Sequence, residues 1–168
     1  MNRYTVAVLV RNQFGVLNRV TSLFRRRQFN INALTVSETE SGEYSRITVH
    51  FDGDEINKQQ LINQLYKLPD VCSIKELKKE DSVSVELLLI KVANLPETRD
   101  DVLTAAGAFD AKIIDYTKDA IIFQLTADAG QIDNFIQLMQ DGEILEICRT
   151  GVVSLERGSS TIRKVTNY

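Results

Sequence analysis

Arg11-Asn12-Gln13-Phe14-Gly15-Val16-Leu17 is the stretch that decides the beginning of the fold, because it joins two segments of different periodicity. Before it, residues 4–10 read Tyr-Thr-Val-Ala-Val-Leu-Val and predict a strand rich in β-branched residues. After it, apolar residues recur at helical spacing and predict a helix over residues 16–27. The chain therefore begins with a strand that turns through glycine into a helix.

Such a turn directs several backbone N–H groups without helical partners toward one point, where the positive end of the helix dipole favours an anion. The turn has a single glycine and no following Lys-Ser/Thr pair, so a nucleotide phosphate fits it poorly. We expect a compact anion, such as the carboxylate of an amino acid. The alternative is an ordinary strand-to-helix turn in which Gly15 relieves backbone strain.

The composition is that of a globular protein with one or two small domains. Its 168 residues are 43% hydrophobic and 26% charged with a net charge of −3, which argues against a general nucleic-acid binder. No apolar run approaches the roughly 20 residues that span a bilayer, and the chain starts with a strand pattern instead of a signal peptide. We therefore expect a cytoplasmic protein that binds neither nucleic acid nor membrane.

The first half predicts the order strand, helix, strand, strand, helix, strand. The expected strands cover residues 4–10, 31–39, 44–51 and 71–77, and the expected helices follow residues 15 and 55. Glu40-Ser41-Gly42-Glu43 is a polar loop with glycine and predicts a hairpin between the second and third strands. Residues 79–82 form a charged, non-periodic segment, which we interpret as a linker.

The same order repeats after the linker. The expected strands cover residues 83–92, 112–116, 120–126 and 144–155, and two helices carry apolar stripes over residues 102–109 and 132–139. From residue 159 the sequence is polar and lacks an apolar stripe, so we expect residues 159–168 to be a flexible tail.

This doubled β-α-β-β-α-β order predicts an α+β fold of two ferredoxin-like domains, over residues 1–78 and 83–158. Each domain is expected to place two helices on one face of an antiparallel sheet. The other face of each sheet and its edge strands need cover. Pairing with a second copy supplies that cover, so we expect a homodimer.

The residues that catalysis requires are missing from the pattern. The sequence shows no nucleophile beside a base, no paired inward-facing carboxylates and no cluster of metal ligands. His50 is the only histidine, and we expect it to be half-buried or at the surface. Cys72 and Cys148 fit no zinc or redox spacing and are expected to be buried, reduced thiols. The sequence therefore predicts neither catalytic residues nor a bound metal.

Arg25-Arg26-Arg27, at the end of the first helix, is the strongest charge feature of the chain. One interpretation is favourable placement of cations at a helix C-terminus. The other is a docking surface for an acidic partner or a phosphate, with Arg46 as a further docking candidate.

Short segments between about Val6 and Gly158 form an ordered series. Its members are Asn12-Gln13-Phe14-Gly15-Val16-Leu17-Asn18-Arg19-Val20, Leu23-Phe24, Arg26-Arg27, Phe29-Asn30-Ile31, Leu34-Thr35-Val36, Ser45-Arg46-Ile47-Thr48, Gln64-Leu65-Tyr66-Lys67-Leu68, Asp70-Val71, Glu86-Leu87-Leu88-Leu89-Ile90-Lys91-Val92, Phe109, Ala111-Lys112-Ile113-Ile114-Asp115, Arg149-Thr150-Gly151 and Arg157-Gly158. Taken together, this series resembles the family of small regulatory subunits of acetolactate synthase (acetohydroxyacid synthase).

That resemblance implies an ACT domain in the first half, dimerised through its sheet, with a branched-chain amino acid such as valine bound between subunits. It also implies that the chain has no activity and no cofactor of its own. The implied partner is the large catalytic subunit of acetolactate synthase, which carries thiamine diphosphate, magnesium and FAD. The small subunit then raises the activity of that partner and transmits feedback inhibition.

The resemblance and the residues together predict the site for the amino acid. Backbone N–H groups near Gly15 are expected to hold the carboxylate, while the Asn12 amide and carbonyl groups near Asn30 take the ammonium. The predicted ligand-binding residues are Asn12, Gly15, Val16, Leu17, Asn30 and Ile31.

Two positions depart from the family pattern. Gln28 stands where glycine often ends the first helix, which predicts a helix exit without a left-handed glycine cap. Asp110 stands where a basic or small residue is common. The sequence leaves two alternatives open: a stand-alone amino-acid-responsive transcription regulator, and a small enzyme on the same fold.

Overall fold

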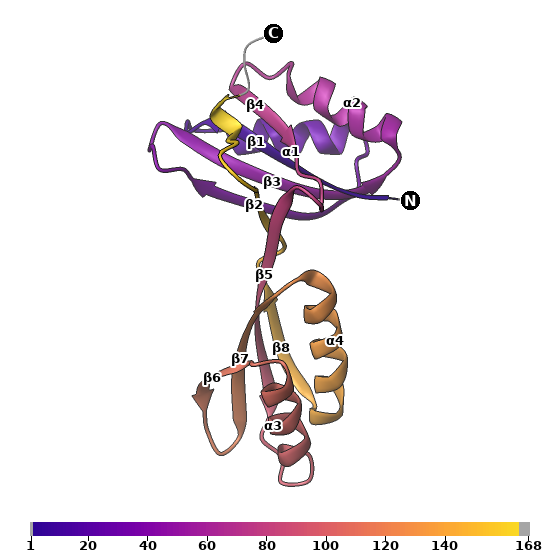
Figure 1. Cartoon of the computed structure of the whole chain (residues 1–168), viewed down its shortest axis with the longest axis vertical. Coiled ribbons are helices and arrows are strands. Elements are labelled where there is room, and N and C mark those ends of the chain that lie inside the picture. The colour runs from indigo at the N-terminus through magenta and orange to yellow at the C-terminus, as the bar shows by residue number, and fades with distance from the viewer. Residues whose placement is uncertain (1, 165–168) are drawn as a thin grey trace. The chain divides into compact units, whose positions relative to one another are not determined.

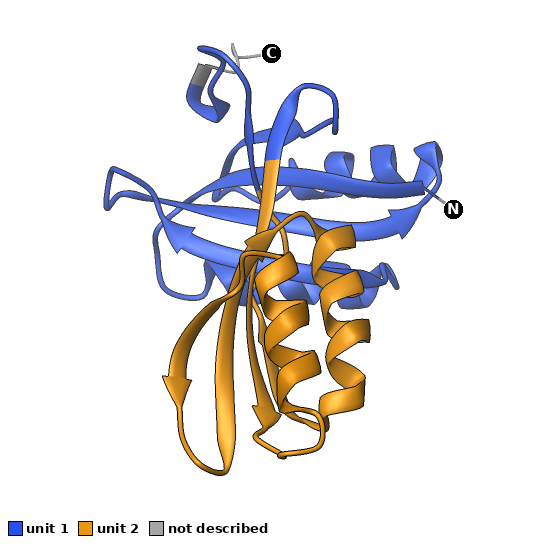
Figure 2. Cartoon of the chain, turned by 60° about the horizontal axis from the view of Figure 1, so that its bottom comes forward, with its two compact units in different colours: residues 1–83, 154–168 blue, residues 84–153 orange. Residues whose placement is uncertain are grey.

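The computed structural model describes the backbone of residues 2–164 and divides the chain into two compact units (Figure 2). The first unit contains the residues up to 83 together with those from 154 onward, and the second contains residues 84–153. The predicted second domain, residues 83–158, extends further toward the C-terminus than the second unit does. Two antiparallel sheets with interleaved helices confirm the α+β class and the two ferredoxin-like motifs (Figure 1).

The first unit is the predicted β-α-β-β-α-β motif. Its elements are β1 (Asn2–Arg11), α1 (Val16–Arg26), β2 (Ile31–Glu38), β3 (Tyr44–Gly53), α2 (Glu55–Leu65) and β4 (Val71–Glu76). The strands pair antiparallel in the order β2-β3-β1-β4, which leaves β2 and β4 at the edges. β2 follows α1 directly, so the start of β2 lies at the end of the helix that the glycine turn begins.

Alternation along the strands separates the two faces of this sheet. Val6 and Val8 of β1 pair with Val49 and Ile47 of β3, and all four pack with the two helices in one core. Ala7 points to the opposite face, which carries no helix of this motif. We call it the open face of the first unit.

The C-terminal part of the chain lies against this open face. We call residues 154–164 the C-terminal strap; it contains most of β9 (Val153–Glu156) and the short 3-10 helix η2 (Ile162–Lys164), which contacts β1 and β4 (Figure 1). Ala7 and Leu9 are at most 4% exposed although they point away from both helices. The predicted cover for this face was a second copy, whereas the strap of the same chain contacts it.

Single side chains hold the strap. Arg46 Nη2 donates to the Ser154 carbonyl oxygen at 2.6 Å, and Lys75 pairs with Glu156 and donates to Ser160 Oγ at 2.5 Å. Within the expected tail, residues 159–168, the side chains of Ser160 and Arg163 contact the first unit. Residues 165–168 of that expected tail lie outside the described residues.

The second unit repeats the motif. Its elements are β5 (Ser82–Ala93), α3 (Arg99–Ala108), β6 (Lys112–Tyr116), β7 (Ala120–Ala127), α4 (Ala129–Met139), η1 (Gln140–Gly142) and β8 (Ile144–Arg149). The sheet order is β6-β7-β5-β8, and Phe123, Phe135 and Ile90 are fully buried in its core. The expected last strand over residues 144–155 is two strands, β8 and β9, separated at Gly151 with a φ of 73°.

The exit of α1 has no glycine cap, as the sequence indicates, and Gln28 itself takes the left-handed conformation with a φ of 56°. The expectations for His50 and for the two cysteines were wrong. His50 is buried at 4% exposure, with Nδ1 2.9 Å from Thr5 Oγ1, because it lies on the open face between neighbouring strands. Cys72 and Cys148 are free but exposed, since Cys72 is the second residue of edge strand β4 and Cys148 lies on edge strand β8. Within the described part of the chain, no helix is long and apolar enough to cross a membrane.

Candidate functional site

The glycine turn has the geometry that the sequence predicts. Gly15 is the residue before α1 and has a φ of 82°, in the left-handed region that a residue with a Cβ enters at a cost. No side chain caps the helix, because the N-cap position is this glycine. The N-terminus of α1 is therefore open to an external hydrogen-bond acceptor.

The unpaired donors at this point differ slightly from the predicted ones. The Val16 N–H donates to the Gln13 carbonyl oxygen across 3.3 Å, so it is partly occupied. Among the described residues, no group accepts from the N–H groups of Gly15, Leu17 or Asn18. Three donors that need an acceptor thus surround the start of the helix.

A cation stands beside these donors. A Cβ on Gly15 would lie 3.7 Å from Nη1 of Arg19, so the guanidinium is adjacent to the turn. Arg19 also pairs with Asp70 at 2.8 Å, which holds its side chain in place. Helix dipole, free N–H groups and Arg19 together favour an anion at this point.

Asn12 fastens the turn to the β2–β3 hairpin. Its backbone N–H donates to the Glu43 carbonyl oxygen at 2.8 Å, and its side-chain Nδ2 donates to the Gly42 carbonyl oxygen at 3.0 Å and to Glu38 Oε1 at 3.1 Å. The amide donors of Asn12 are therefore used within the chain. Its Oδ1 remains as an acceptor, and the carboxylate of Glu38 lies beside it.

Glu38 and Arg19 are site residues that sequence reasoning missed. Arg19 stood one helical turn after Gly15, at a spacing that places both on one side of the helix start. Glu38 gave no such signal, because it reaches Asn12 through the register of both β2 and β1 on β3.

Asn30 and Ile31 lie at the opposite end of α1 from the glycine turn. The 11 residues of the helix separate them by about 16 Å along its axis. Within one subunit, the structure thus brings together Asn12, Gly15, Val16 and Leu17 but not the second part of the predicted site. Ile31 begins β2, whose outer edge pairs with no strand of the described chain.

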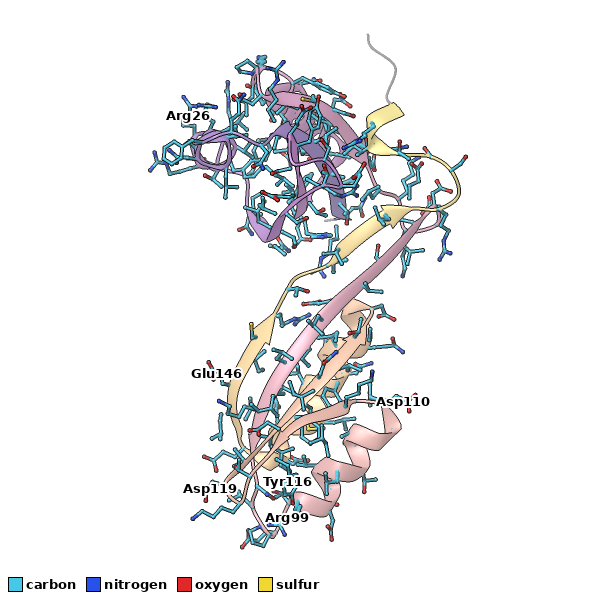
Figure 3. The ribbon with its side chains drawn as sticks, turned by 90° about the vertical axis from the view of Figure 1, so that its left-hand side faces the viewer. Arg26, Arg99, Asp110, Tyr116, Asp119 and Glu146 are labelled. Carbon is cyan, nitrogen blue, oxygen red and sulfur yellow. The ribbon has the colours of Figure 1, made fainter. Side chains whose placement is uncertain are left out.

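The arginine run borders a basic groove, which we define by its six lining residues. The groove has a volume of about 290 Å³ and is lined by Leu23, Arg26, Arg27, Gln64, Lys67 and Leu68. Arg26 extends outward from α1 in Figure 3, and Arg27 Nη2 donates to Gln64 Oε1 at 3.3 Å. Three cations and two leucine side chains in one lining suit an acidic segment with an apolar side chain.

Arg46 is engaged elsewhere. Besides its bond to Ser154, it is half-buried, and burial lowers the pKa of its guanidinium below the ordinary value. Its position on the open face gives it a role in holding the C-terminal strap. Among the residues that the structure describes, no three His, Cys, Asp or Glu side chains gather as metal ligands.

Two family models match most of the chain. Residues 6–73 match the ACT domain of acetohydroxyacid synthase small subunits, and residues 85–158 match the small subunit of acetolactate synthase. An Archaeoglobus fulgidus protein named "Probable acetolactate synthase small subunit" is 43% identical over 94% of this chain and 98% of its own length. The acetolactate synthase small subunit of Bacillus subtilis is 38% identical over 92% of this chain and 90% of its own length.

A solved structure agrees with these sequence matches. The crystal structure of the acetolactate synthase small subunit from Thermotoga maritima has a TM-score of 0.88 and 33% identity, covering 95% of this chain and all of that one. Fold, motif order and sequence identity thus point to one family, as the resemblance of the short segments implied. This chain belongs to the family of acetolactate synthase small subunits.

Proposed function

We propose that the chain is a non-catalytic regulatory subunit, which binds valine, raises the turnover of an acetolactate synthase catalytic subunit and transmits feedback inhibition to it. The observation that carries the proposal is the set of unpaired N–H groups and Arg19 at the start of α1, in a chain of this family. Both are suited to the carboxylate of a free amino acid.

The other end of an amino acid has a matching surface. An ammonium group needs acceptors, and Asn12 Oδ1 and the Glu38 carboxylate supply them beside the turn. With the carboxylate held at Gly15 and the ammonium at Asn12, the size of the apolar surroundings decides which ligand side chain fits. This size limit is the physical basis of selectivity among branched-chain amino acids.

A homodimer completes this site. β2 has an unpaired outer edge, and two copies related by a two-fold axis pair such edges antiparallel. Antiparallel pairing centred on the eight residues of β2 sets Ile31 of the partner subunit opposite Glu38. Asn30 and Ile31 of one subunit then face Asn12 and Gly15 of the other, so each dimer has two sites.

The chemistry belongs to the partner in this proposal. The catalytic subunit of acetolactate synthase carries thiamine diphosphate, magnesium and FAD, and this chain binds none of them. We place both proteins in the cytoplasm.

The basic groove and Arg25 are the proposed docking surface for the catalytic subunit. The cations Arg26, Arg27 and Lys67 line the groove together with the apolar side chains of Leu23 and Leu68. An acidic segment of the partner with one apolar side chain matches both features. Phosphate alone has no apolar group to pack against these two leucine side chains.

The function is tested by mixing the purified chain with a matching catalytic subunit and measuring the condensation of pyruvate with and without valine. We expect no acetolactate from the chain alone, faster turnover in the mixture and inhibition of that mixture by valine. Acetolactate formation by the isolated chain, or a mixture that responds neither in turnover nor to valine, would overturn the proposal.

A further inference from the structure

The loop between β2 and β3 is attached on two sides. Asn12, in the proposed amino-acid site, bonds to Glu38, Gly42 and Glu43, as described above. Thr39 and Glu40 of the same hairpin bond to the C-terminal strap instead, and Tyr44 makes a cation–π contact with it. One short hairpin thus joins the ligand turn to the far end of the chain.

Arg163 is the strap residue that makes this second attachment. Its Nη1 lies 3.0 Å from Glu40 Oε1, and its Nη2 donates to Thr39 Oγ1 at 3.3 Å. The guanidinium also lies 5.7 Å from the centre of the Tyr44 ring, within the range of a cation–π contact. Three residues at the base of the hairpin are therefore held by one side chain.

Thr39 connects this attachment to the conformation of the loop. Its hydroxyl donates to the carbonyl oxygens of Ser41 at 2.9 Å and Tyr44 at 3.2 Å as alternatives, and it accepts from the Ser41 N–H at 3.2 Å. The next residues, Gly42 and Glu43, supply the carbonyl oxygens that Asn12 uses. A change at Thr39 is thus transmitted to Asn12 through two peptide units.

The positive charge of Arg163 also favours the binding of an amino-acid carboxylate near the hairpin. The hairpin carries the carboxylates of Glu38, Glu40 and Glu43 within six residues, close to the place proposed for an anionic ligand group. Arg163 neutralises Glu40 by direct pairing. Without it, the local negative charge opposes the carboxylate of an approaching amino acid.

We infer that Arg163 is a positioning residue for the amino-acid site, acting through the Thr39–Tyr44 hairpin on Asn12. The inference rests on the proposed function. Arg163 lies beyond residue 158, where the match to the small-subunit family model ends. It links the ligand site to the strap, which is continuous along the chain with the second unit.

Substitution of Arg163 leaves the strap attached, because other contacts hold it independently. Arg46 bonds to Ser154, and Lys75 bonds to Glu156 and Ser160, so none of these contacts uses residues 39–44. Ser160→Ala is therefore the matched control, since it removes a strap contact that does not involve residues 39–44.

The test is calorimetric titration of L-valine into the full-length chain. Arg163→Ala is expected to raise the Kd for valine about fivefold, at the lower end of coupling between distinct sites. Arg163→Lys keeps the charge but loses the forked geometry, so its Kd is expected between the Kd of the wild type and that of Arg163→Ala. Ser160→Ala is expected to bind like wild type. Because the pair is exposed, the effect of Arg163→Ala is expected to shrink in about 1 M salt.

A double-mutant cycle separates positioning from general destabilisation. Asn12→Ala and Arg163→Ala are expected to be non-additive, because each change releases the same hairpin. Additive effects, equal losses in Arg163→Ala and Ser160→Ala, or an unchanged Kd in Arg163→Ala would each overturn the inference.

Gly15→Asp distinguishes this failure from failure of the proposed function. If Gly15→Asp abolishes valine binding while Arg163→Ala binds like wild type, only the positioning role is lost. If Gly15→Asp itself binds valine like wild type, the amino acid does not bind at the turn, and both proposals are overturned.

Discussion

Gln28 and Asp110 occupy the same position in the two units, each with a positive φ (56° and 53°) just after the first helix of its motif. After α1, the Phe29 N–H donates to the Phe24 carbonyl oxygen and the Gln28 N–H to that of Arg25. After α3, the corresponding bonds join residues 111 to 106 and 110 to 107. Both helices therefore end in a Schellman motif whose left-handed residue is not glycine.

The first prediction follows from this strain. Gln28→Gly is expected to stabilise the first unit by about 1 kcal/mol, because a residue with a Cβ adopts the left-handed region at a cost that glycine avoids. The measurement is denaturant unfolding followed by circular dichroism. Gln59→Gly, the same chemical change in the middle of α2, is the control and is expected to destabilise by about 1 kcal/mol. Loss of stability in Gln28→Gly would show that its side chain contributes more than the strain costs.

The sequence predicted the elements that depend on local periodicity. Val6 and Val8 alternate along β1, and Val20, Leu23 and Phe24 recur along α1, so each segment indicates its own structure and its buried face. The glycine turn was predictable for the same reason, since it lies between two clear patterns.

The remaining features depend on partners distant in the sequence. The strap is polar and has no periodic pattern of apolar residues. It is held by single side chains, such as Arg46 and Lys75, from strands far away in the chain. Glu38 reaches Asn12 only through strand register. Gln28 adopts a left-handed conformation because Phe29, packed against the core, fixes the chain after it. The local propensity of a segment does not indicate such tertiary constraints.

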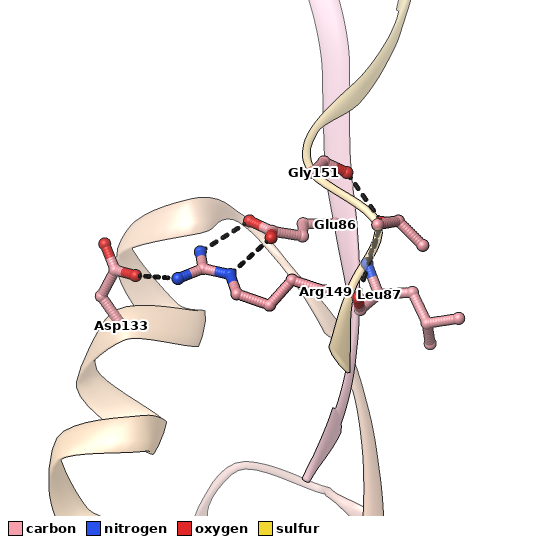
Figure 4. A network of polar contacts seen from close by, with 6 residues as sticks. Glu86, Leu87, Asp133, Arg149 and Gly151 are labelled. Atoms are coloured by element: carbon pink, nitrogen blue, oxygen red, sulfur yellow. Dashed lines mark hydrogen bonds and ion pairs between the residues drawn. The ribbon is translucent and has the colours of Figure 1, made fainter. Parts of the chain in front are cut away.

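The second prediction concerns an ion pair in the second unit whose carboxylate is buried and whose guanidinium is partly exposed (Figure 4). Arg149 binds both oxygens of Glu86, at 2.6 and 2.8 Å, and Nη1 reaches Asp133 at 2.8 Å. These bonds, those to Glu86 first, raise the pKa of the Arg149 guanidinium above its ordinary value. Because the Glu86 side chain is only 3% exposed, Arg149→Ala leaves a buried carboxylate without its partner. We expect a loss of about 3 kcal/mol in unfolding free energy.

Two further variants test this explanation in the same unfolding assay. Asp133→Ala removes a partner that is 59% exposed and is expected to cost less than about 1 kcal/mol. Glu86→Leu combined with Arg149→Met removes both charges of the pair and is expected to recover much of the loss. Equal destabilisation by Arg149→Ala and by the double variant would mean that packing, not the unpaired charge, is responsible.

The third prediction is a pH dependence of the C-terminal strap. Hydrogen bonds from Lys75 first and Ser160 second hold the pKa of the Glu156 carboxyl below its ordinary value of 4.5. A carboxyl with a lowered pKa stabilises the folded form above the unfolded pKa, and this contribution is lost as the pH falls through the folded pKa. We therefore expect the strap to be held above pH 4.5 and to loosen progressively below it.

Hydrogen exchange of peptides covering the strap, corrected for intrinsic rates, measures this loosening between pH 3 and 7. Glu156→Gln is expected to be loosened already at pH 7 and to lose the pH dependence, whereas Ser160→Ala keeps it. A strap equally protected at pH 3 and 7 in the wild-type chain would show that other contacts dominate.

The fourth prediction tests the glycine turn directly. Gly15→Asp places a carboxylate beside Arg19, at the point proposed for the carboxylate of valine. Like-charge repulsion in a partly desolvated site is expected to cost a few kcal/mol, or roughly a hundredfold in the Kd for valine. Gly15→Asn is the matched control, because asparagine has the same size, also tolerates a positive φ and carries no charge.

We expect Gly15→Asn to weaken valine binding much less than Gly15→Asp, and both variants to keep the fold and still activate the catalytic subunit. Calorimetry gives the affinities, and the pyruvate assay shows whether the complex with Gly15→Asp ignores valine. Equal weakening in both variants would assign the effect to the bulk of the new side chain instead of its charge. A folded Gly15→Asp protein with wild-type valine inhibition would make this an ordinary turn, in which glycine only relieves the backbone.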